Sequence, residues 1–283
     1  TRIQNLEEVI VSSIRVKQNA PIAFTNVSKD ELGKKNLGQD LPILLNSLTS
    51  VVTTSDAGAG VGYTGIRIRG INAQSTNITI NGIPYNDAES LGTFWVDLPD
   101  FASSIENLQL QRGVGTSTNG SSAFGASINI LTNLISKTPY FENSNSIGSY
   151  NTTKNTFKFS TGILNDYFEF SGRLSKIDSD GYIDRSSSDL KSYFLQVNYK
   201  KENTLIKALS FGGHEITYQA WNGIDEETLQ SDRTYNPSGM YIDQSGDIQF
   251  YDNEVDNYKQ DHYQIHWSQI INSRLTSNLS FNL

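Results

Sequence analysis

The stretch that decides the fold runs from Arg112 to Thr132 and has the sequence RGVGTSTNGSSAFGASINILT. An alternating run, Leu108–Gln111, precedes it, and a second apolar run, Ser127–Leu131, lies close to its end. Small, polar and glycine residues fill the space between the two runs, which is typical of a tight loop. The stretch therefore predicts a strand, a glycine-rich loop and a second strand.

The composition limits the classes of protein that fit. The 283 residues include no cysteine and three histidines, so disulfides and thiolate metal sites are excluded and histidine ligands are few. The net charge of −8 argues against a nucleic-acid partner. No run approaches about 18 apolar residues, which excludes transmembrane helices, whereas a membrane β-barrel leaves only weak alternation. No signal peptide is recognisable, so the chain is expected to be mature or to begin downstream of one.

The first half of the chain combines short helices with short strands. Ser28–Glu31 has the form of a capping box, and a second helix is expected to begin near Asp40. Ile66–Arg69 and Ile78–Ile80 are strand-like, and Asn81-Gly82 after the second of them is a strong turn signal. This half is therefore expected to form a small α+β unit.

After Thr138-Pro139 the sequence changes to longer alternating strands. Apolar residues occupy every second position in segments such as Phe168–Leu174 and Tyr193–Tyr199. A soluble β-sandwich has the same alternation, but here short turns alternate with long polar loops at 179–189 and 218–257, which favours an outer-membrane barrel. We count roughly seven strands, too few to close a barrel, so we expect an N-terminal part of a longer protein or a barrel completed elsewhere.

Several motifs resemble the plug domain of TonB-dependent outer-membrane receptors. The matching segments are Asp40–Leu48, Ile66–Gly70, Ile78–Pro84, Ile105–Gly113 and Gly120–Thr132. They resemble, in order, the family's first plug helix, its "IRG" strand, its "DGVP" turn, its "IExIevlRG" strand and its "GGvINIiT" strand. The departures from the family pattern are Thr49-Ser50 for Pro-Gly, Asn81 for Asp, Val114 for Pro, Asn119 for Tyr and Ala126 for Gly. The set is specific although each motif alone is weak, and a fainter resemblance continues through nearly the whole chain.

The resemblance implies a mainly β fold, in which a small α+β plug lies inside a 22-stranded transmembrane β-barrel with about seven of its strands in this chain. The expected divisions are a TonB-box and extended segment at 1–20, a plug domain at 21–138 and an incomplete N-terminal part of the barrel at 139–283. The implied location is the bacterial outer membrane, in contact with its lipid. Catalysis is not expected, since no catalytic triad or phosphate loop is recognisable, and no cofactor or metal site is predicted.

Two sets of residues are implied to couple the plug to its surroundings. Leu6–Ser13 resembles the TonB box, centred on Glu8, Val9, Ile10, Val11 and Ser12. Such an extended segment can add a strand to a partner's sheet edge, and an ordinary first plug strand is the alternative. The implied partner is TonB with its inner-membrane energising complex, and a surface lipoprotein is left open. Arg69 and Arg112 end two plug strands, where the family pairs arginines with barrel glutamates in a lock; solvated arginines are the alternative.

The resemblance also indicates where a ligand would bind, between the outward plug loops and the outer barrel loops. The candidate binding residues are Tyr63, Asn72, Gln74, Tyr85, Asp87, Glu89, Trp95, Trp221, Tyr235 and Tyr241. Aromatic and amide side chains suit a planar or glycan-like ligand, and packing between plug and barrel is the alternative for each. Nine acidic residues against the single Arg233 in the 218–257 loop argue against an anion held by arginines and permit a carboxylate-built cation site.

The function implied by the resemblance is TonB-dependent active uptake of a scarce nutrient. An iron–siderophore complex is the leading ligand, and cobalamin, haem or an oligosaccharide are the alternatives. Ligand capture is expected to shift the plug between conformations and to expose its N-terminal segment to TonB. From a different class, the alternative is a soluble β-rich binding or adhesion module, whose apolar strand faces would be buried in protein rather than in lipid.

Overall fold

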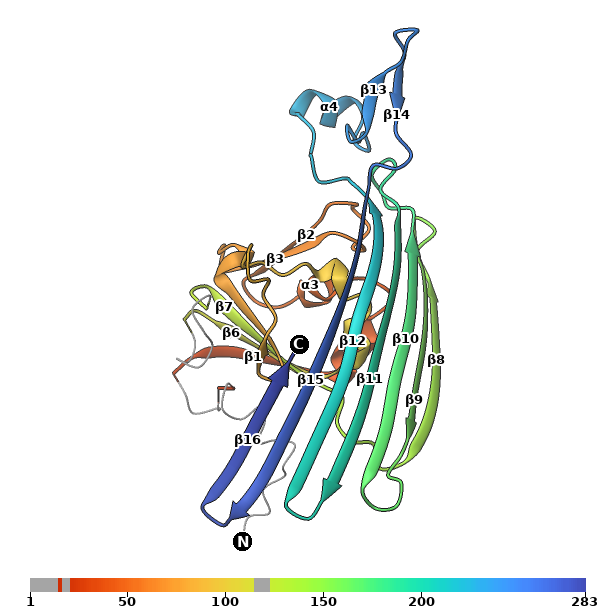
Figure 1. Ribbon diagram of the computed structural model, residues 1–283. Helices are drawn as coiled ribbons and strands as arrows, with labels where there is room; N and C mark the ends of the chain where they lie inside the picture. The colour runs from red at the N-terminus through yellow and green to blue at the C-terminus, as the bar shows by residue number, and fades with distance from the viewer. Residues whose placement is uncertain (1–14, 17–20, 115–122) are drawn as a thin grey trace.

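The computed structural model describes residues 15–16, 21–114 and 123–283. Within these ranges the chain forms an α+β unit on a five-stranded sheet, and a seven-stranded sheet that curves along one side of it (Figure 1). No helix in the described ranges is both long and apolar enough to span a membrane.

The five-stranded sheet is mixed and has the strand order β1-β6-β7-β4-β5. Its strands are β1 (Ala23–Ser28), β4 (Thr76–Ile80), β5 (Ile83–Pro84), β6 (Ile105–Arg112) and β7 (Ala126–Thr132). β6 and β7 pair antiparallel, which confirms the two strands predicted around the Arg112–Thr132 stretch, and β4 lies parallel to β7. A separate antiparallel ladder joins β2 (Val51–Ser55) to β3 (Thr64–Ile68).

Local sequence signals set the helices and turns of this unit. The predicted capping box is present at the start of α2 (Lys29–Lys35): the Ser28 hydroxyl accepts from the Glu31 amide, and the Glu31 carboxylate accepts from the Ser28 amide. Asp40 is the N-cap of α3 (Leu41–Leu45). Asn81 and Gly82 have φ of 53° and 85°, as the predicted turn between β4 and β5 requires. The three 3-10 helices are η1 (Ala73–Ser75), η2 (Trp95–Asp97) and η3 (Phe101–Ser104).

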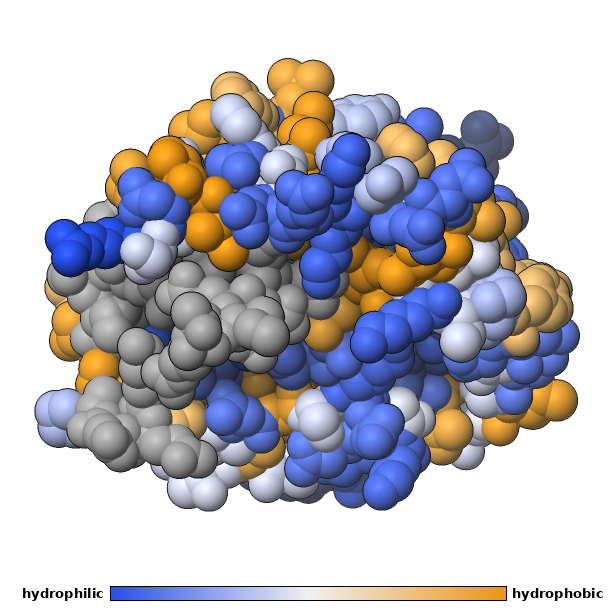
Figure 2. Space-filling model, turned by 90° about the horizontal axis from the view of Figure 1, so that it is seen from below, coloured by the Kyte–Doolittle hydropathy of each residue, from blue (hydrophilic) through white to orange (hydrophobic). Residues whose placement is uncertain are grey.

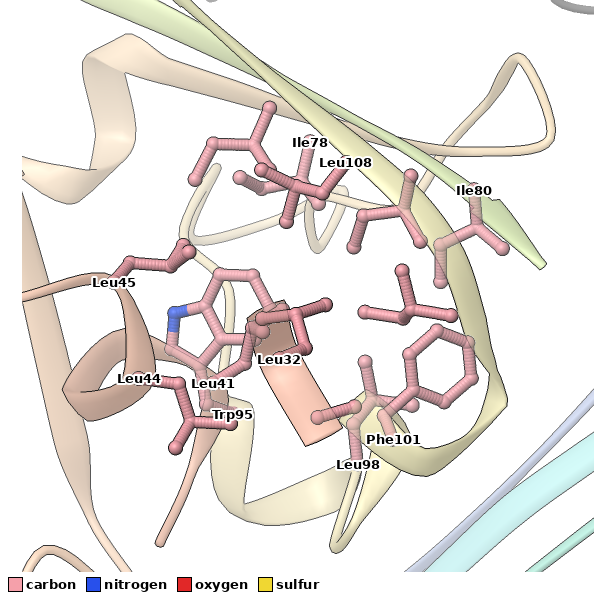
Figure 3. Packing of buried hydrophobic residues seen from close by; sticks show 14 of the residues in the cluster. Leu32, Leu41, Leu44, Leu45, Ile78, Ile80, Trp95, Leu98, Phe101 and Leu108 are labelled. Atoms are coloured by element: carbon pink, nitrogen blue, oxygen red, sulfur yellow. The ribbon is translucent and has the colours of Figure 1, made fainter. Parts of the chain in front are cut away.

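The core of the α+β unit lies between its sheet and its helices. Leucines of α2 and α3 pack with Trp95, Leu98 and Phe101 against isoleucine and leucine side chains of β4 and β6 (Figure 3). The same cluster continues into the seven-stranded sheet through Phe194 and Phe211, whose rings lie 6.3 and 5.3 Å from that of Phe101. One apolar core therefore joins the two sheets.

The seven-stranded sheet is an antiparallel meander with the order β16-β15-β12-β11-β10-β9-β8. Its strands are β8 (Pro139–Ile147), β9 (Thr153–Thr161), β10 (Phe168–Ser179), β11 (Ser188–Lys201), β12 (Thr204–Tyr218), β15 (Val255–Asn272) and β16 (Leu275–Asn282). The strand count matches the prediction, but β12 and β15 have 15 and 18 residues, longer than the ten expected, since both continue past the apolar band toward the long connection.

The two faces of this sheet differ as the alternation predicts. The face toward the α+β unit buries polar and small side chains, such as Thr156, Ser175 and Gln196. The opposite face exposes large apolar side chains, among them Phe157, Phe159, Phe168, Phe170, Leu174, Leu195, Val197, Ile265, Trp267 and Phe281. An exposed apolar band of this extent suits contact with lipid and does not suit contact with water.

The two ends of the sheet also differ. The connections β9–β10, β11–β12 and β15–β16 are short and lie at the lower end in Figure 1. Hydrophilic side chains cover much of this end (Figure 2). The long connection at the upper end carries α4 (Glu226–Ser231) and a hairpin of β13 (Met240–Ile242) and β14 (Ile248–Phe250), elements that the sequence did not predict. The chain thus has the predicted alternation of short and long connections.

Candidate functional site

A buried charge cluster anchors the α+β unit to the curved sheet. Asp100, in the left-handed conformation (φ 52°) between η2 and η3, is 3% exposed. Its Oδ1 lies 2.9 Å from Nζ of Lys154 on β9, and its Oδ2 lies 3.4 Å from Nη1 of Arg173 on β10. Both cations are buried as well. We call Asp100, Lys154 and Arg173 the Asp100 anchor.

Neutral donors complete the anchor. The Asp100 carboxylate accepts hydrogen bonds from the hydroxyls of Thr156 (2.7 Å) and Ser175 (2.6 Å) on the sheet. It also accepts from Asn36 Nδ2 (2.9 Å) and the Ser103 hydroxyl (2.6 Å) within the α+β unit. Burial alone raises the pKa of Asp100, but the two cations and the hydroxyl donors outweigh it and hold that pKa well below its usual range. The carboxylate is therefore charged, and it is satisfied from both sides of the interface.

The main chain next to Asp100 is fixed to the sheet too. The carbonyl oxygen of Pro99 accepts from the Ser192 hydroxyl (2.6 Å) on β11 and from Arg173 Nη1 (3.1 Å). β12 has a glycine, Gly213, where the chain of Asp97 and Pro99 crosses it: a Cβ there would lie 2.8 Å from Cδ of Pro99 and 3.1 Å from the Asp97 carbonyl carbon. The 97–100 segment can therefore cross β12 this closely only because residue 213 has no side chain.

Sequence reasoning missed this anchor and placed the lock at Arg69 and Arg112. Arg112 is 9% exposed and donates to the Thr49 carbonyl and the Thr25 hydroxyl, both at 2.9 Å, inside the α+β unit. Arg69 is exposed. Burial, and then the nearby charge of Arg69, lowers the pKa of Arg112. In the described part of the chain neither arginine pairs with a carboxylate, so the predicted glutamate lock stays a prediction. The signal for the anchor was present, since charged residues on the inner face of an alternating strand require buried partners.

A cavity of about 360 Å³ opens between the α+β unit and the upper part of the sheet. Its aromatic lining consists of Tyr63, Tyr85, Phe94 and Tyr258. The Tyr85 hydroxyl donates to Gln260 Oε1 of β15 at 3.1 Å, and the Trp221 ring packs edge-on against Tyr63 with the centroids 5.0 Å apart. The cavity is thus built jointly by the α+β unit, β15 and the start of the long connection.

Carboxylates form the other part of the lining: Asp87, Glu89, Asp97 and Asp256. Tyr63 donates a short hydrogen bond from its hydroxyl to Asp256 at the start of β15. Burial, and then the charge of Asp256, raises the pKa of Asp97 to about 7. The other titratable groups that face Asp97 are Tyr63, Tyr85 and Glu215 of β12. The lining of the cavity is therefore acidic, with four carboxyl groups.

The structure brings together only part of the predicted ligand-binding set. Tyr63, Tyr85, Asp87 and Glu89 line the cavity, with Trp221 beside them. Trp95 does not: it is 3% exposed and packs among the leucines of α3, so its ring is unavailable to a ligand (Figure 3). Exposure of Trp95 was inferred from its polar neighbours in the sequence, but the ring is buried because it gains apolar contacts in the core.

The other predicted ligand residues lie away from the cavity. Asn72 and Gln74 are exposed on the segment around η1, outside the lining. Tyr235 and Tyr241 belong to the long connection, where Tyr241 stacks on Tyr251 with the ring centroids 4.3 Å apart. Asp87 has a local role as well, since its Oδ1 accepts from the Ser90 amide at 2.6 Å. The predicted TonB box, Glu8 to Ser12, lies outside the described residues.

In the part of the chain that the structure describes, no three or more histidine, cysteine, aspartate or glutamate side chains group so as to hold a metal ion. His262 stacks on Phe211 with the ring centroids 5.0 Å apart, and His266 exchanges hydrogen bonds with Ser280 and Gln264. These rings take part in packing and in hydrogen bonds along the inner face of the sheet.

An α+β unit held inside the curve of a lipid-facing antiparallel sheet defines a class of protein, the outer-membrane barrels that contain a plug. Comparison with known proteins gives the family. Residues 16–127 match the model of the TonB-dependent Receptor Plug Domain. The α+β unit is therefore a plug domain of the TonB-dependent receptor type, and the homologues of the chain among these receptors are outer-membrane β-barrel proteins.

Relatives of known role are similar over much of the chain. The Vitamin B12 transporter BtuB of Vibrio vulnificus is 29% identical over 184 residues, 64% of this chain and 29% of its own. The probable TonB-dependent siderophore receptor PirA of Acinetobacter baumannii is 24% identical over 268 residues, 86% of this chain and 33% of its own. The present chain therefore spans about a third of the length of these relatives, which are a transporter and a receptor and not enzymes.

Solved structures share the fold. The FpvA receptor of P. aeruginosa in complex with an iron-loaded pyoverdine superposes with a TM-score of 0.71 at 10% identity, covering 94% of this chain and 34% of that one. The match includes both the plug and the curved sheet, so the seven-stranded sheet corresponds to a part of a receptor barrel.

Proposed function

We propose that the protein takes up a scarce nutrient across the bacterial outer membrane with energy from TonB, and that the nutrient is an iron–siderophore complex. The observation that carries this proposal is the cavity that the plug and the sheet build jointly, lined by Tyr63 and Tyr85 and lying beside the long connection. A ligand bound there touches the plug and the curved sheet together, so its binding energy can change the contact between them.

The relatives support the ligand class. PirA is a probable siderophore receptor, and the similar ferrienterobactin receptor of Escherichia coli takes an iron complex by its name. BtuB is a vitamin B12 transporter, and its 29% identity makes cobalamin the second candidate. Each of these ligands is a bulky chelate with apolar surface, which suits an aromatic-lined cavity.

Further parts of the proposal concern the division of labour along the chain. Residues 1–20 would contain the segment that binds TonB, with Glu8 to Ser12 pairing as a strand. Residues 21–138 would act as the plug and 139–283 as the first part of the barrel. The Asp100 anchor would hold the plug against the wall until ligand and TonB act, because a buried charge pair is costly to break from one side.

The experiment that tests the proposal is capture of the full-length protein, in detergent, by the periplasmic domain of TonB. Capture is measured without ligand and with ferric siderophores, cobalamin and haem, for the intact protein and for a variant lacking Leu6–Ser13. Ligand-dependent capture that is lost on deletion is expected, and the effective compound gives the ligand class. A protein that stays soluble without detergent and is never captured would overturn the proposal in favour of a soluble binding module.

A further inference from the structure

One carboxylate in the cavity has no partner. Asp97 is 8% exposed, its side chain lines the cavity, and its carboxylate has neither a hydrogen bond nor an ion pair within the described residues. Its position is fixed, because its main chain lies against Gly213 of β12 and leaves no room for a side chain there. Asp97 is thus held in place without any contact that uses its charge.

A second buried carboxylate lies next to it. Glu215 of β12 is fully buried; its Oε2 accepts from the Thr217 hydroxyl at 2.6 Å, and its Oε1 has no partner among the described residues. Tyr63 and Asp256 line the cavity, are joined by their own hydrogen bond, and lie close enough to Glu215 to interact with its carboxyl. Two carboxylates with unused acceptor capacity therefore lie in and behind one cavity wall.

Such an arrangement costs free energy unless a positive charge completes it. A buried carboxylate without a partner loses its hydration and regains nothing, so it either takes up a proton or binds a cation. Burial and the nearby charge of Asp256 raise the pKa of Asp97 to about 7, as expected for a carboxyl with no cation beside it. Among its described lining residues the cavity has no lysine, arginine or histidine that could supply the charge.

The aromatic lining narrows the kind of cation. Tyr63, Tyr85 and Tyr258 present rings beside the carboxylates, and Trp221 packs behind Tyr63. Aromatic faces attract organic ammonium and guanidinium groups, whose carbon substituents also gain from apolar contact. An anionic chelate in the same cavity would meet Asp87, Glu89, Asp97 and Asp256 at close range and be repelled.

We propose that this cavity binds a positively charged organic group, a primary ammonium or a guanidinium, that the imported ligand carries outside its metal-binding core. Asp97 and Glu215 supply the negative charge, and Tyr63 and Asp256 close the site toward the long connection. The inference rests on the proposed uptake function and specifies the chemistry of its ligand. A cavity of this chemistry excludes triply anionic catecholate chelates as the ligand.

The test uses three iron complexes on the full-length protein in detergent, with binding followed by tryptophan fluorescence and by capture on the TonB periplasmic domain. The first is a ferric trihydroxamate with a pendant primary ammonium, and the second is the same complex with that amine acetylated. The third is a ferric tris-catecholate. The first two share an iron core and differ by one positive charge, so their ratio of dissociation constants isolates the proposed contact without any change to the protein.

The ammonium complex is expected to bind about tenfold or more tightly than its acetylated form. Asp97→Asn and Glu215→Gln should each reduce this ratio toward one while leaving the affinity for the acetylated form unchanged. The control is Glu202→Gln, which removes the same charge at an exposed turn between β11 and β12 at the opposite end of the sheet. It should keep the wild-type ratio.

The outcomes separate the two proposals. Equal affinity for both hydroxamates, or stronger binding of the catecholate, together with TonB capture would overturn the charge inference and leave the uptake function standing. Asp97-dependent binding of the ammonium complex without TonB capture would do the reverse. If none of the three complexes bound or promoted capture, both proposals would be overturned for iron chelates.

Discussion

Replacement of Asp100 by asparagine tests how strongly the plug is held to the barrel wall. The substitution keeps the size of the side chain and removes one charge from the Asp100 anchor. It leaves the ammonium of Lys154 and the guanidinium of Arg173 buried, with side-chain exposures of 3% and 2%, and without a counter-ion. The amide also introduces two donors among groups that already donate, namely the hydroxyls of Thr156 and Ser175.

The expected cost is about 3–5 kcal/mol of the free energy that holds the 97–104 segment against β9 and β10, because one partner of a buried pair is removed and the other stays. Hydrogen bonds to the same carboxylate are not additional, since they are lost together with the charge and are not additive. At about 1.4 kcal/mol per tenfold change, this corresponds to roughly two to three and a half decades in an opening equilibrium.

Hydrogen exchange read by mass spectrometry on the full-length protein in detergent measures that equilibrium by segment. Amides of 97–113 and of β9 are expected to exchange about 100-fold or more faster in Asp100→Asn. The matched control is Glu142→Gln, which removes a carboxylate from an exposed pair with Lys158 at 3.3 Å and should cost less than about 1 kcal/mol. The double variant Asp100→Asn/Lys154→Met should recover part of the loss, since it removes one of the two unpaired cations.

A change in exchange no larger than that of Glu142→Gln would refute the reasoning, because the anchor would then contribute no more than a surface ion pair. Strict additivity in the double variant would also count against it, since directly paired groups are expected to couple by about 0.5–3 kcal/mol.

Gly213→Ala places a Cβ 2.8 Å from a proline ring of the plug, so it should cost about 1–3 kcal/mol of plug protection in hydrogen exchange, whereas Gly33→Ala, with no atom within 4 Å, should cost nothing. Because the pKa of Asp97 is raised to about 7, the folded plug binds that proton more tightly than the unfolded chain does; thermal stability should fall as pH rises from about 4 to about 7, and Asp97→Asn should make this slope shallower. For the same reason, affinity for the ammonium complex should rise between about pH 6 and 8 in the wild type and rise less in that variant. Leu195→Arg, on the exposed face near the middle of β11, should destabilise the protein folded in a bilayer by about 2–4 kcal/mol, as measured by urea titration. Tyr199→Arg, near the end of the strand, should cost about 0–1 kcal/mol, and equal costs would contradict a lipid-facing band.

Sequence patterns were sufficient wherever the cause of a structure lies within a few residues. The capping box at Ser28 and the turn at Asn81-Gly82 form where they were predicted, since each depends on side chains one to three positions away. The second helix also begins near Asp40 as predicted, although the Asp40 side chain does not cap it and accepts instead from the Thr64 hydroxyl. The seven strands of the curved sheet were likewise predicted, because a period of two records the difference between lipid on one face and plug on the other.

Sequence patterns failed where burial depends on what lies opposite. Trp95 stands in a loop with Asn, Asp and Glu and was expected to contact a ligand, yet α3 covers it and it becomes part of the core. A local pattern contains no information on which distant element will cover a given side chain.

The sequence by itself determined that the chain has a plug-like unit followed by lipid-facing strands, because turn chemistry, capping and alternation are local. Only the tertiary structure decided that Asp100 meets Lys154 and Arg173, and that Asp97 and Asp256 line one cavity with Glu215 close to both. These residues lie far apart in the chain, and any of them alone resembles an ordinary solvated charge. Their proximity follows from the register in which the plug docks on the sheet, and Gly213 and the shared aromatic core fix that register.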